Sequence, residues 1–127
     1  IIGSDTLVVK NGKIYGKPKD RSEAIKMLRD IQGGTYSAYT SLAILIEYRG
    51  KYKEFKEVQK VDVTVSSITD AEIIEYVDSE EPYDKAGGYA IQGFMSGYIS
   101  KIHGNYHTVV GLPVARLNRL LKNIKAL

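Results

Sequence analysis

The sequence contains no cysteine and no tryptophan, and it has only three prolines among 127 residues. Because cysteine is absent, the chain can form neither disulfides nor thiolate metal sites. A chain without disulfides is compatible with a reducing compartment, and we expect a cytoplasmic protein. No apolar run approaches the roughly 20 residues that a membrane-spanning helix needs, so we predict no membrane segment. His103 and His107 have no third metal ligand at a recognisable spacing, and we interpret them as turn or strand residues.

A strong excess of charge is missing as well. Lys and Arg total 18 against 15 Asp and Glu, a net charge of +3, which suits an anionic ligand but is weak evidence for nucleic acid. Ten tyrosines are present, yet residues 51–57 mix both charge signs around their aromatics, a pattern typical of a solvated strand. A nucleic-acid binder therefore stays the weakest interpretation, and a steep fall of affinity with salt would favour it.

Composition predicts one domain, residues 1–127, with 43% hydrophobic and 26% charged residues. We expect an α/β fold with a mixed sheet, a long antiparallel hairpin and flanking helices. The predicted elements are strand 1–9, a type I′ turn at Asn11-Gly12, helix 20–32, a hairpin from Thr35 to Val65 turning at Arg49-Gly50, a helix from Thr69 to just before Glu81, strand 98–102, an extended segment 106–110, and a last helix from Leu112.

Two helices carry start signals in the sequence. Asp20 with Glu23, and Thr69 with Glu72, have the spacing of capping boxes. In the first helix we expect Ala24, Leu28 and Ile31 on the buried face; in the second we expect Ile73, Ile74 and Val77 there. Both helices are interpreted as scaffold, and the second is expected to position the segment that begins at Glu81.

The segment from Glu81 to Gly93 is too irregular for a regular helix or strand. It places Asp84 beside Lys85, follows them with Gly87 and Gly88, and ends near Gln92. Glycines allow positive φ and close backbone approach to a ligand, and a carboxamide both donates and accepts hydrogen bonds. The segment predicts either a ligand site or a surface loop with an ordinary ion pair.

Asp5 interrupts the apolar, β-branched run at the start of the chain. A carboxylate in a buried strand costs several kcal/mol unless it is paired, hydrogen-bonded or metal-bound. The alternative is a strand-end position where Asp5 bonds nearby backbone amides. The Asn11-Gly12 turn returns a basic loop containing Lys17 toward Asp5, and a carboxylate facing lysines is the arrangement that metal-assisted phosphate chemistry requires.

Together, the motifs G-S-D-T, N-G-x-I-x-G-K-P-x-D, E-P-x-D-K-A-G-x-Y-x-I-Q-G and V-V-G-L-P resemble those of the Maf family of nucleoside triphosphate pyrophosphatases. The resemblance runs from Ile2 to about Leu121. It implies an elongated fold shared with inosine triphosphatase-like enzymes. It also implies metal-dependent hydrolysis of nucleoside triphosphates to monophosphate and pyrophosphate, as housecleaning of the nucleotide pool, with a homodimer as the default assembly.

The same resemblance implies roles for individual residues. Asp5 matches the family's essential carboxylate, which binds the metal or deprotonates the attacking water, and Lys17 and Lys85 match basic positions that neutralise the phosphates. Asp84 is expected to bind the metal, Mg²⁺ or Mn²⁺, or to hold Lys85. The substrate-binding residues are expected to be Thr6, Gly87, Gly88 and Gln92. Tyr36, Tyr39 and Thr40 lie near a family segment but are given no role.

Gln92 indicates the base. The branch with Ile-Gln-Gly and Ser-Asp-Thr is similar to pyrophosphatases of dTTP, UTP and modified pyrimidine nucleotides, whereas Glu at this place marks the 7-methyl-GTP branch. A carboxamide can pair with the carbonyl and imide groups of thymine or uracil, which would repel an ionised carboxylate.

One departure from the family bears on activity. Maf proteins begin with a strand and a Ser-x-Ser-Pro-Arg-Arg loop ahead of the Gly-Ser-Asp-Thr motif, and this chain has no such segment. We therefore expect it to represent the C-terminal two thirds or so of a Maf-like domain. The alternative function is a non-catalytic nucleotide-binding or cell-division regulatory protein, which absence of the phosphate loop would favour.

Overall fold

The computed structural model describes residues 1–89 and 91–125. Its centre is a five-stranded sheet in the order β2-β1-β3-β4-β5, and all pairs in it are antiparallel. The α/β class and the long hairpin are confirmed, whereas the expected mixed sheet is corrected to an antiparallel one in the described residues. The strands are β1 (Ile2–Lys10), β2 (Lys13–Tyr15), β3 (Thr35–Tyr48), β4 (Lys51–Val65) and β5 (Ile99–His103).

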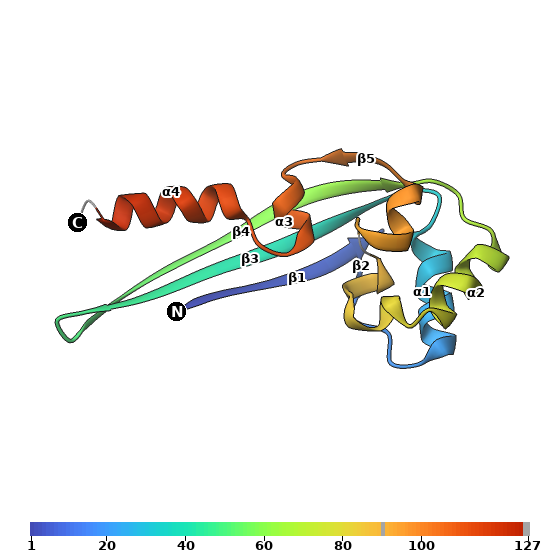
Figure 1. The fold of residues 1–127 in the computed structure, drawn as a ribbon, viewed down its shortest axis with the longest axis horizontal. Coiled ribbons are helices and arrows are strands. Elements are labelled where there is room, and N and C mark those ends of the chain that lie inside the picture. The colour runs from blue at the N-terminus through green and yellow to red at the C-terminus, as the bar shows by residue number, and fades with distance from the viewer. Residues whose placement is uncertain (90, 126–127) are drawn as a thin grey trace.

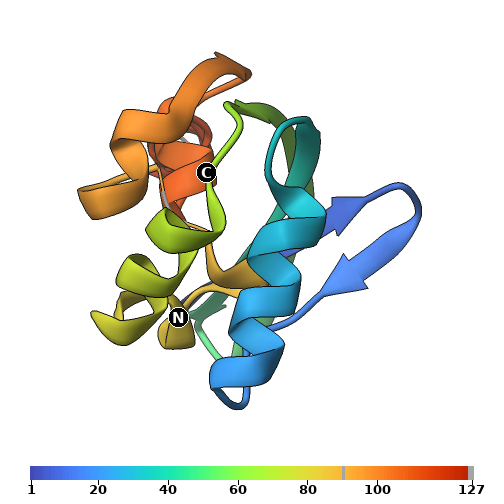
Figure 2. The same ribbon diagram turned by 90° about the vertical axis from the view of Figure 1, so that its right-hand side faces the viewer.

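The helices cover two separate parts of this sheet, as Figure 1 shows. α1 and α2 lie at one end, and α4 lies beside the outer part of the β3–β4 hairpin. Figure 2 views the end that carries α1 and α2 and shows the β1–β2 hairpin projecting beside α1. The α-helices are α1 (Arg21–Ile31), α2 (Asp70–Asp78), α3 (Tyr106–Val110) and α4 (Val114–Lys125), and three 3₁₀ helices are η1 (Glu81–Asp84), η2 (Ala86–Gly88) and η3 (Gly93–Tyr98).

Alternating residues of the long hairpin make the sheet side of the core. In β4, Val61, Val63 and Val65 are each no more than 2% exposed, as their period-two spacing predicts. The hairpin turns at Arg49 and Gly50, with φ of 52° and 74°. Two successive positive φ values define the primed turn whose twist matches that of the flanking strands.

The two predicted capped helices supply the other side of the core. Ala24, Leu28 and Ile31 of α1 are fully buried, and the capping box at the start of α2 is present in full. One prediction for α2 is wrong: Ile74 is 37% exposed.

Tyr76 takes the buried place on α2, at 1% exposure. Its ring stacks on Phe94 with centroids 5.2 Å apart, and its hydroxyl donates to the Gly88 carbonyl at 2.9 Å. Because the phenol finds a partner for its one polar atom, burying it costs little. The α2 helix thus holds the 81–93 segment through Tyr76.

The expectation of an extended segment at 106–110 is wrong, because these residues form the short helix α3. Asn105 caps it, its Oδ1 accepting from the Thr108 amide at 3.1 Å. The β-branched residues Thr108, Val109 and Val110 favour strand by propensity. The cap and the tertiary contacts of Thr108, which is fully buried, override that preference.

The apolar face of α4 packs incompletely. Val114 and Leu121 remain 43% and 39% exposed. The Arg116 Nε donates to both carboxylate oxygens of Glu57 on β4, at 3.0 and 2.8 Å, which ties the helix to the hairpin. None of the helices described is both long and apolar enough to cross a membrane.

Lys10 caps the C-terminus of α1. Its Nζ donates to the carbonyls of Asp30 and Ile31 at 3.0 and 2.9 Å, where backbone acceptors lack helical partners and the helix dipole is negative. We expect Lys10→Met to lower the free energy of unfolding by about 1–2 kcal/mol, measured by urea denaturation.

Lys13→Met is the matched control for this prediction. Lys13 is 57% exposed and its Nζ lies 3.7 Å from an Asp30 carboxylate oxygen. An exposed ion pair of this kind contributes about 0–1 kcal/mol, so the control should lose less stability than Lys10→Met. Equal losses in the two variants would contradict a capping role for Lys10.

Candidate functional site

A pocket of about 340 Å³ opens beside β1 and brings together segments that are distant in the sequence. β1 and β3 form one wall, the loop after β2 and the segment around η1 and η2 form a second, and the end of α3 forms a third. The polar residues that line it are Ser4, Asp5, Thr6, Lys17, Tyr36, Asp84, Lys85, Tyr89 and Gln92.

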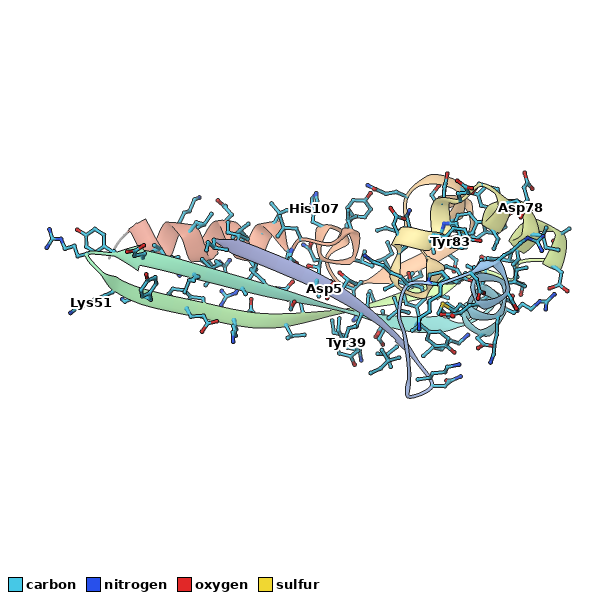
Figure 3. All side chains as sticks on the ribbon, turned by 90° about the horizontal axis from the view of Figure 1, so that it is seen from below. Asp5, Tyr39, Lys51, Asp78, Tyr83 and His107 are labelled. Carbon is cyan, nitrogen blue, oxygen red and sulfur yellow. The ribbon has the colours of Figure 1, made fainter. Side chains whose placement is uncertain are left out.

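Asp5 stands in the middle of β1, opposite Ser41 of β3. Figure 3 shows its place on the strand. Asp5 is exposed, so the expected buried carboxylate is wrong. The alternative is wrong in placing Asp5 at a strand end but right in its bond to a nearby backbone amide. Asp5 Oδ1 accepts from the Thr6 amide at 2.9 Å. That bond orients the carboxylate, and Oδ2 makes no side-chain hydrogen bond with the described residues.

A series of hydroxyl hydrogen bonds holds the Thr6 side chain in place. Its Oγ1 lies 2.9 Å from Thr40 Oγ1, and Thr40, which is fully buried, donates to the Thr108 carbonyl at 2.8 Å. Because the Thr40 proton goes to Thr108, Thr6 is the donor to Thr40. These hydrogen bonds join β1, β3 and α3, so the polar groups behind the pocket wall have partners and hold the wall in place.

Lys17 and Lys85 reach the pocket from two loops that are bonded to each other. The Gly87 amide donates to the Gly16 carbonyl at 2.9 Å, which holds the Lys17 loop against the 81–93 segment. Lys17 is exposed and has no ion-pair partner among the described residues. Its charge is therefore available to an anion in the pocket.

Lys85 is anchored at the pocket edge. Its Nζ donates to the Glu81 carbonyl at 2.8 Å and to Asp84 Oδ1 at 2.9 Å. The hydrogen bond and charge of Lys85, with a smaller effect of Lys17, hold the pKa of Asp84 below its usual value. Asp84 thus stays ionised at neutral pH. It is 81% exposed, so this ion pair itself contributes little stability.

Gly87 and Gly88 are not among the residues that line the pocket. Both are buried with φ of 68° and 75°. A Cβ on Gly87 would lie 3.0 Å from Ile31 Cδ1 and 3.1 Å from Val8 Cγ1. In this structure the two glycines serve the turn and its packing against β1 and α1, and the expected close approach of their backbone to a ligand stays a prediction.

Two tyrosines complete the pocket wall, and sequence analysis did not assign them to the site. Tyr36 and Tyr89 pack with ring centroids 5.8 Å apart, and the Tyr89 hydroxyl donates to the Leu28 carbonyl at 2.8 Å. Burial raises the pKa of both phenols, so both are neutral at physiological pH. Tyr36 lies in the alternating buried run of β3, and Tyr89 lies in the irregular 81–93 segment; the sequence assigned neither of them a role.

Gln92 lines the pocket with its side chain exposed. Its Nε2 donates to the Tyr106 hydroxyl at 2.9 Å. The V-V-G motif contributes Val109, Val110 and Gly111 to the same wall, a placement that the sequence alone did not predict.

The described residues supply hard oxygen ligands but no group of three or more metal-ligating side chains. Asp5 and Asp84 both line the pocket. Mg²⁺ is commonly held by one or two carboxylates together with waters and substrate phosphates. The donor set therefore fits a divalent cation that is shared with a phosphate ligand.

The fold and the pocket define an α/β domain whose site combines two carboxylates, two lysines and a carboxamide. The family model of the Maf-like protein matches residues 1–124, so this chain belongs to the Maf family. The five-stranded sheet and its helices thus belong to a Maf family domain.

Curated relatives agree with this assignment. The chain is 45% identical over 125 residues to a protein of Lachnoclostridium phytofermentans, covering 96% of this chain and 62% of the relative. It is 46% identical over 125 residues to one of Caldanaerobacter subterraneus subsp. tengcongensis, at 96% and 58% coverage. A third, of Carboxydothermus hydrogenoformans, is 46% identical over 122 residues, at 96% and 64%.

Each of these three relatives is named dTTP/UTP pyrophosphatase. The chain spans about three fifths of the length of the curated relatives it matches.

Proposed function

We propose that this protein hydrolyses dTTP and UTP to the nucleoside monophosphate and pyrophosphate with Mg²⁺ or Mn²⁺. The observation that carries the proposal is one pocket lined by Asp5, Lys17, Asp84, Lys85 and Gln92. The names of the relatives point to the same substrates. The domain boundaries, the homodimer and the cytoplasmic location stay predictions.

Asp5 is the proposed base. The Asp5 carboxylate accepts a proton from water as the water oxygen forms a bond to the α-phosphorus. The bond between that phosphorus and the oxygen bridging to the β-phosphate breaks, and its electrons leave with pyrophosphate. Thr6, fixed by Thr40, limits the movement of Asp5 because its amide bonds Oδ1 at 2.9 Å.

The lysines stabilise the charge that develops on the phosphates. Lys17 and Lys85 approach from separate loops and offer ammonium donors to different oxygens of one triphosphate. Asp84, together with the substrate phosphates, would hold the divalent cation, which supplies positive charge against the phosphate oxygens when bound. The Asp84 carboxylate is 81% exposed and ionised at neutral pH, so a cation can reach it.

The test is release of pyrophosphate from dTTP, UTP and GTP with either metal. The relative of Lachnoclostridium phytofermentans serves as the positive control. We expect turnover of dTTP and UTP to exceed that of GTP, because Gln92 pairs with the imide edge of thymine or uracil. Nucleotide binding with no turnover, under conditions where the relative is active, would instead support a non-catalytic nucleotide-binding protein.

A further inference from the structure

Helix α3 is a rigid part of the pocket wall despite its five residues. Thr108 is fully buried, and its hydroxyl donates to Gln59 Oε1 at 2.8 Å. Its carbonyl accepts from Thr40 at 2.8 Å, while Ser4 Oγ lies 2.7 Å from the Gly111 carbonyl. These contacts bind α3 and its end to β1, β3 and β4. A side chain on α3 is therefore carried by a fixed support.

Tyr106, the first residue of α3, uses that support to contact the site. Its hydroxyl accepts from Gln92 Nε2 at 2.9 Å. Its ring meets His107 edge-on, with centroids 5.5 Å apart and an interplanar angle of 79°. Tyr106 does not itself line the pocket, whereas Gln92 does. The phenol thus acts on the pocket through the glutamine.

The contact limits the freedom of an exposed side chain. A glutamine has several rotatable bonds, and ordering a side chain of this type costs about 1.5–2 kcal/mol. Tyr106 engages one Nε2 proton, which leaves the second Nε2 proton and Oε1 for a ligand. A neighbouring donor and acceptor match the imide edge of thymine or uracil, where a carbonyl accepts and N3–H donates.

We propose that Tyr106 is a positioning residue that holds the Gln92 carboxamide for pairing with the imide edge of a pyrimidine nucleotide. The inference rests on the proposed function. Tyr106 lies on α3, outside the 81–93 segment that contains Gln92, and would be a further residue that determines the base preference.

The experiment measures dissociation constants for α,β-imido-dTTP and for inorganic tripolyphosphate, both with Mg²⁺. The variants are Tyr106→Phe, Gln92→Ala and the double substitution. Losing one positioning hydrogen bond should weaken dTTP-analogue binding about 3- to 10-fold in Tyr106→Phe. Tripolyphosphate, which has no base, should bind unchanged. In the Gln92→Ala background, Tyr106→Phe should cause no further loss.

Tyr48→Phe is the matched control, because it removes the hydroxyl of a tyrosine in β3 that is 67% exposed and does not line the pocket. It should leave both ligands unaffected. A second measurement needs no ligand. In Tyr106→Phe, the ¹⁵N NMR resonances of the Gln92 side-chain amide should shift, and their relaxation should show that this amide moves more freely.

Three results would overturn the inference. The first is unchanged dTTP-analogue binding by Tyr106→Phe. The second is an equal loss for tripolyphosphate, which would indicate a structural effect. The third is full additivity with Gln92→Ala. A wild-type protein that binds neither ligand would overturn the proposed function as well, which separates that failure from the others.

Discussion

Asp5→Asn is expected to lower the rate of pyrophosphate release from dTTP by about 10²- to 10⁴-fold, the usual contribution of a positioned general base. Asparagine has nearly the same shape, and its carbonyl oxygen can still accept from the Thr6 amide, so the strand should keep its geometry. It lacks the negative charge needed to take a proton from water. The rate is measured at saturating dTTP and Mg²⁺.

Asp78→Asn provides the matched control for Asp5→Asn. Asp78 is also an exposed aspartate, 55% accessible, and its Oδ1 accepts from Arg21 Nε at 2.9 Å. Figure 3 shows it at the end of the molecule that carries α2, far along the chain's long axis from Asp5. This variant should keep its turnover. If Asp5→Asn retained more than a tenth of wild-type turnover, Asp5 would not be the base.

Gly87→Ala is expected to lower the free energy of unfolding by about 2–5 kcal/mol. Alanine at φ of 68° costs about 1–2 kcal/mol. Its Cβ would also lie 3.0 Å from Ile31 Cδ1, tighter than a normal contact, in a packed interior where overpacking costs about 1–3 kcal/mol. Urea denaturation measures the loss.

Gly12→Ala separates these two causes. Gly12 has a similar φ of 77°, but no atom lies within 4 Å of an added Cβ. It should therefore lose only the conformational part, about 1–2 kcal/mol. Equal destabilisation of the two variants would show that packing against Val8 and Ile31 does not require glycine at position 87.

Local signals in the sequence were sufficient for most of the secondary structure. Period-two alternation predicted the buried valines of β4, and capping residues predicted the starts of α1 and α2. The Asn11-Gly12 turn is confirmed by its two positive φ values, 50° and 77°. Such signals work because each depends on residues within a few positions along the chain.

The same local reasoning failed at α3 and at Ile74. A run of β-branched residues favours an extended chain, and the Asn105 cap and the contacts of Thr108 with Thr40 and Gln59 make the helical turn the better state. On α2, Tyr76 is buried in addition to Ile73 and Val77 because Phe94 and the Gly88 carbonyl provide it with partners from another segment.

The sequence by itself singled out six residues that line one pocket, Asp5, Thr6, Lys17, Asp84, Lys85 and Gln92, while Gly87 and Gly88 lie outside its lining and Tyr36 and Tyr89 were given no role. Only the tertiary structure decided how the six are held. The antiparallel pairing of β1 with β3 places Asp5 opposite Ser41, the bond from Gly87 to Gly16 joins the two lysine loops, and α3 brings Tyr106 to Gln92. These are contacts between segments far apart in the chain, and local propensity carries no information about them because they depend on the packing of the whole domain.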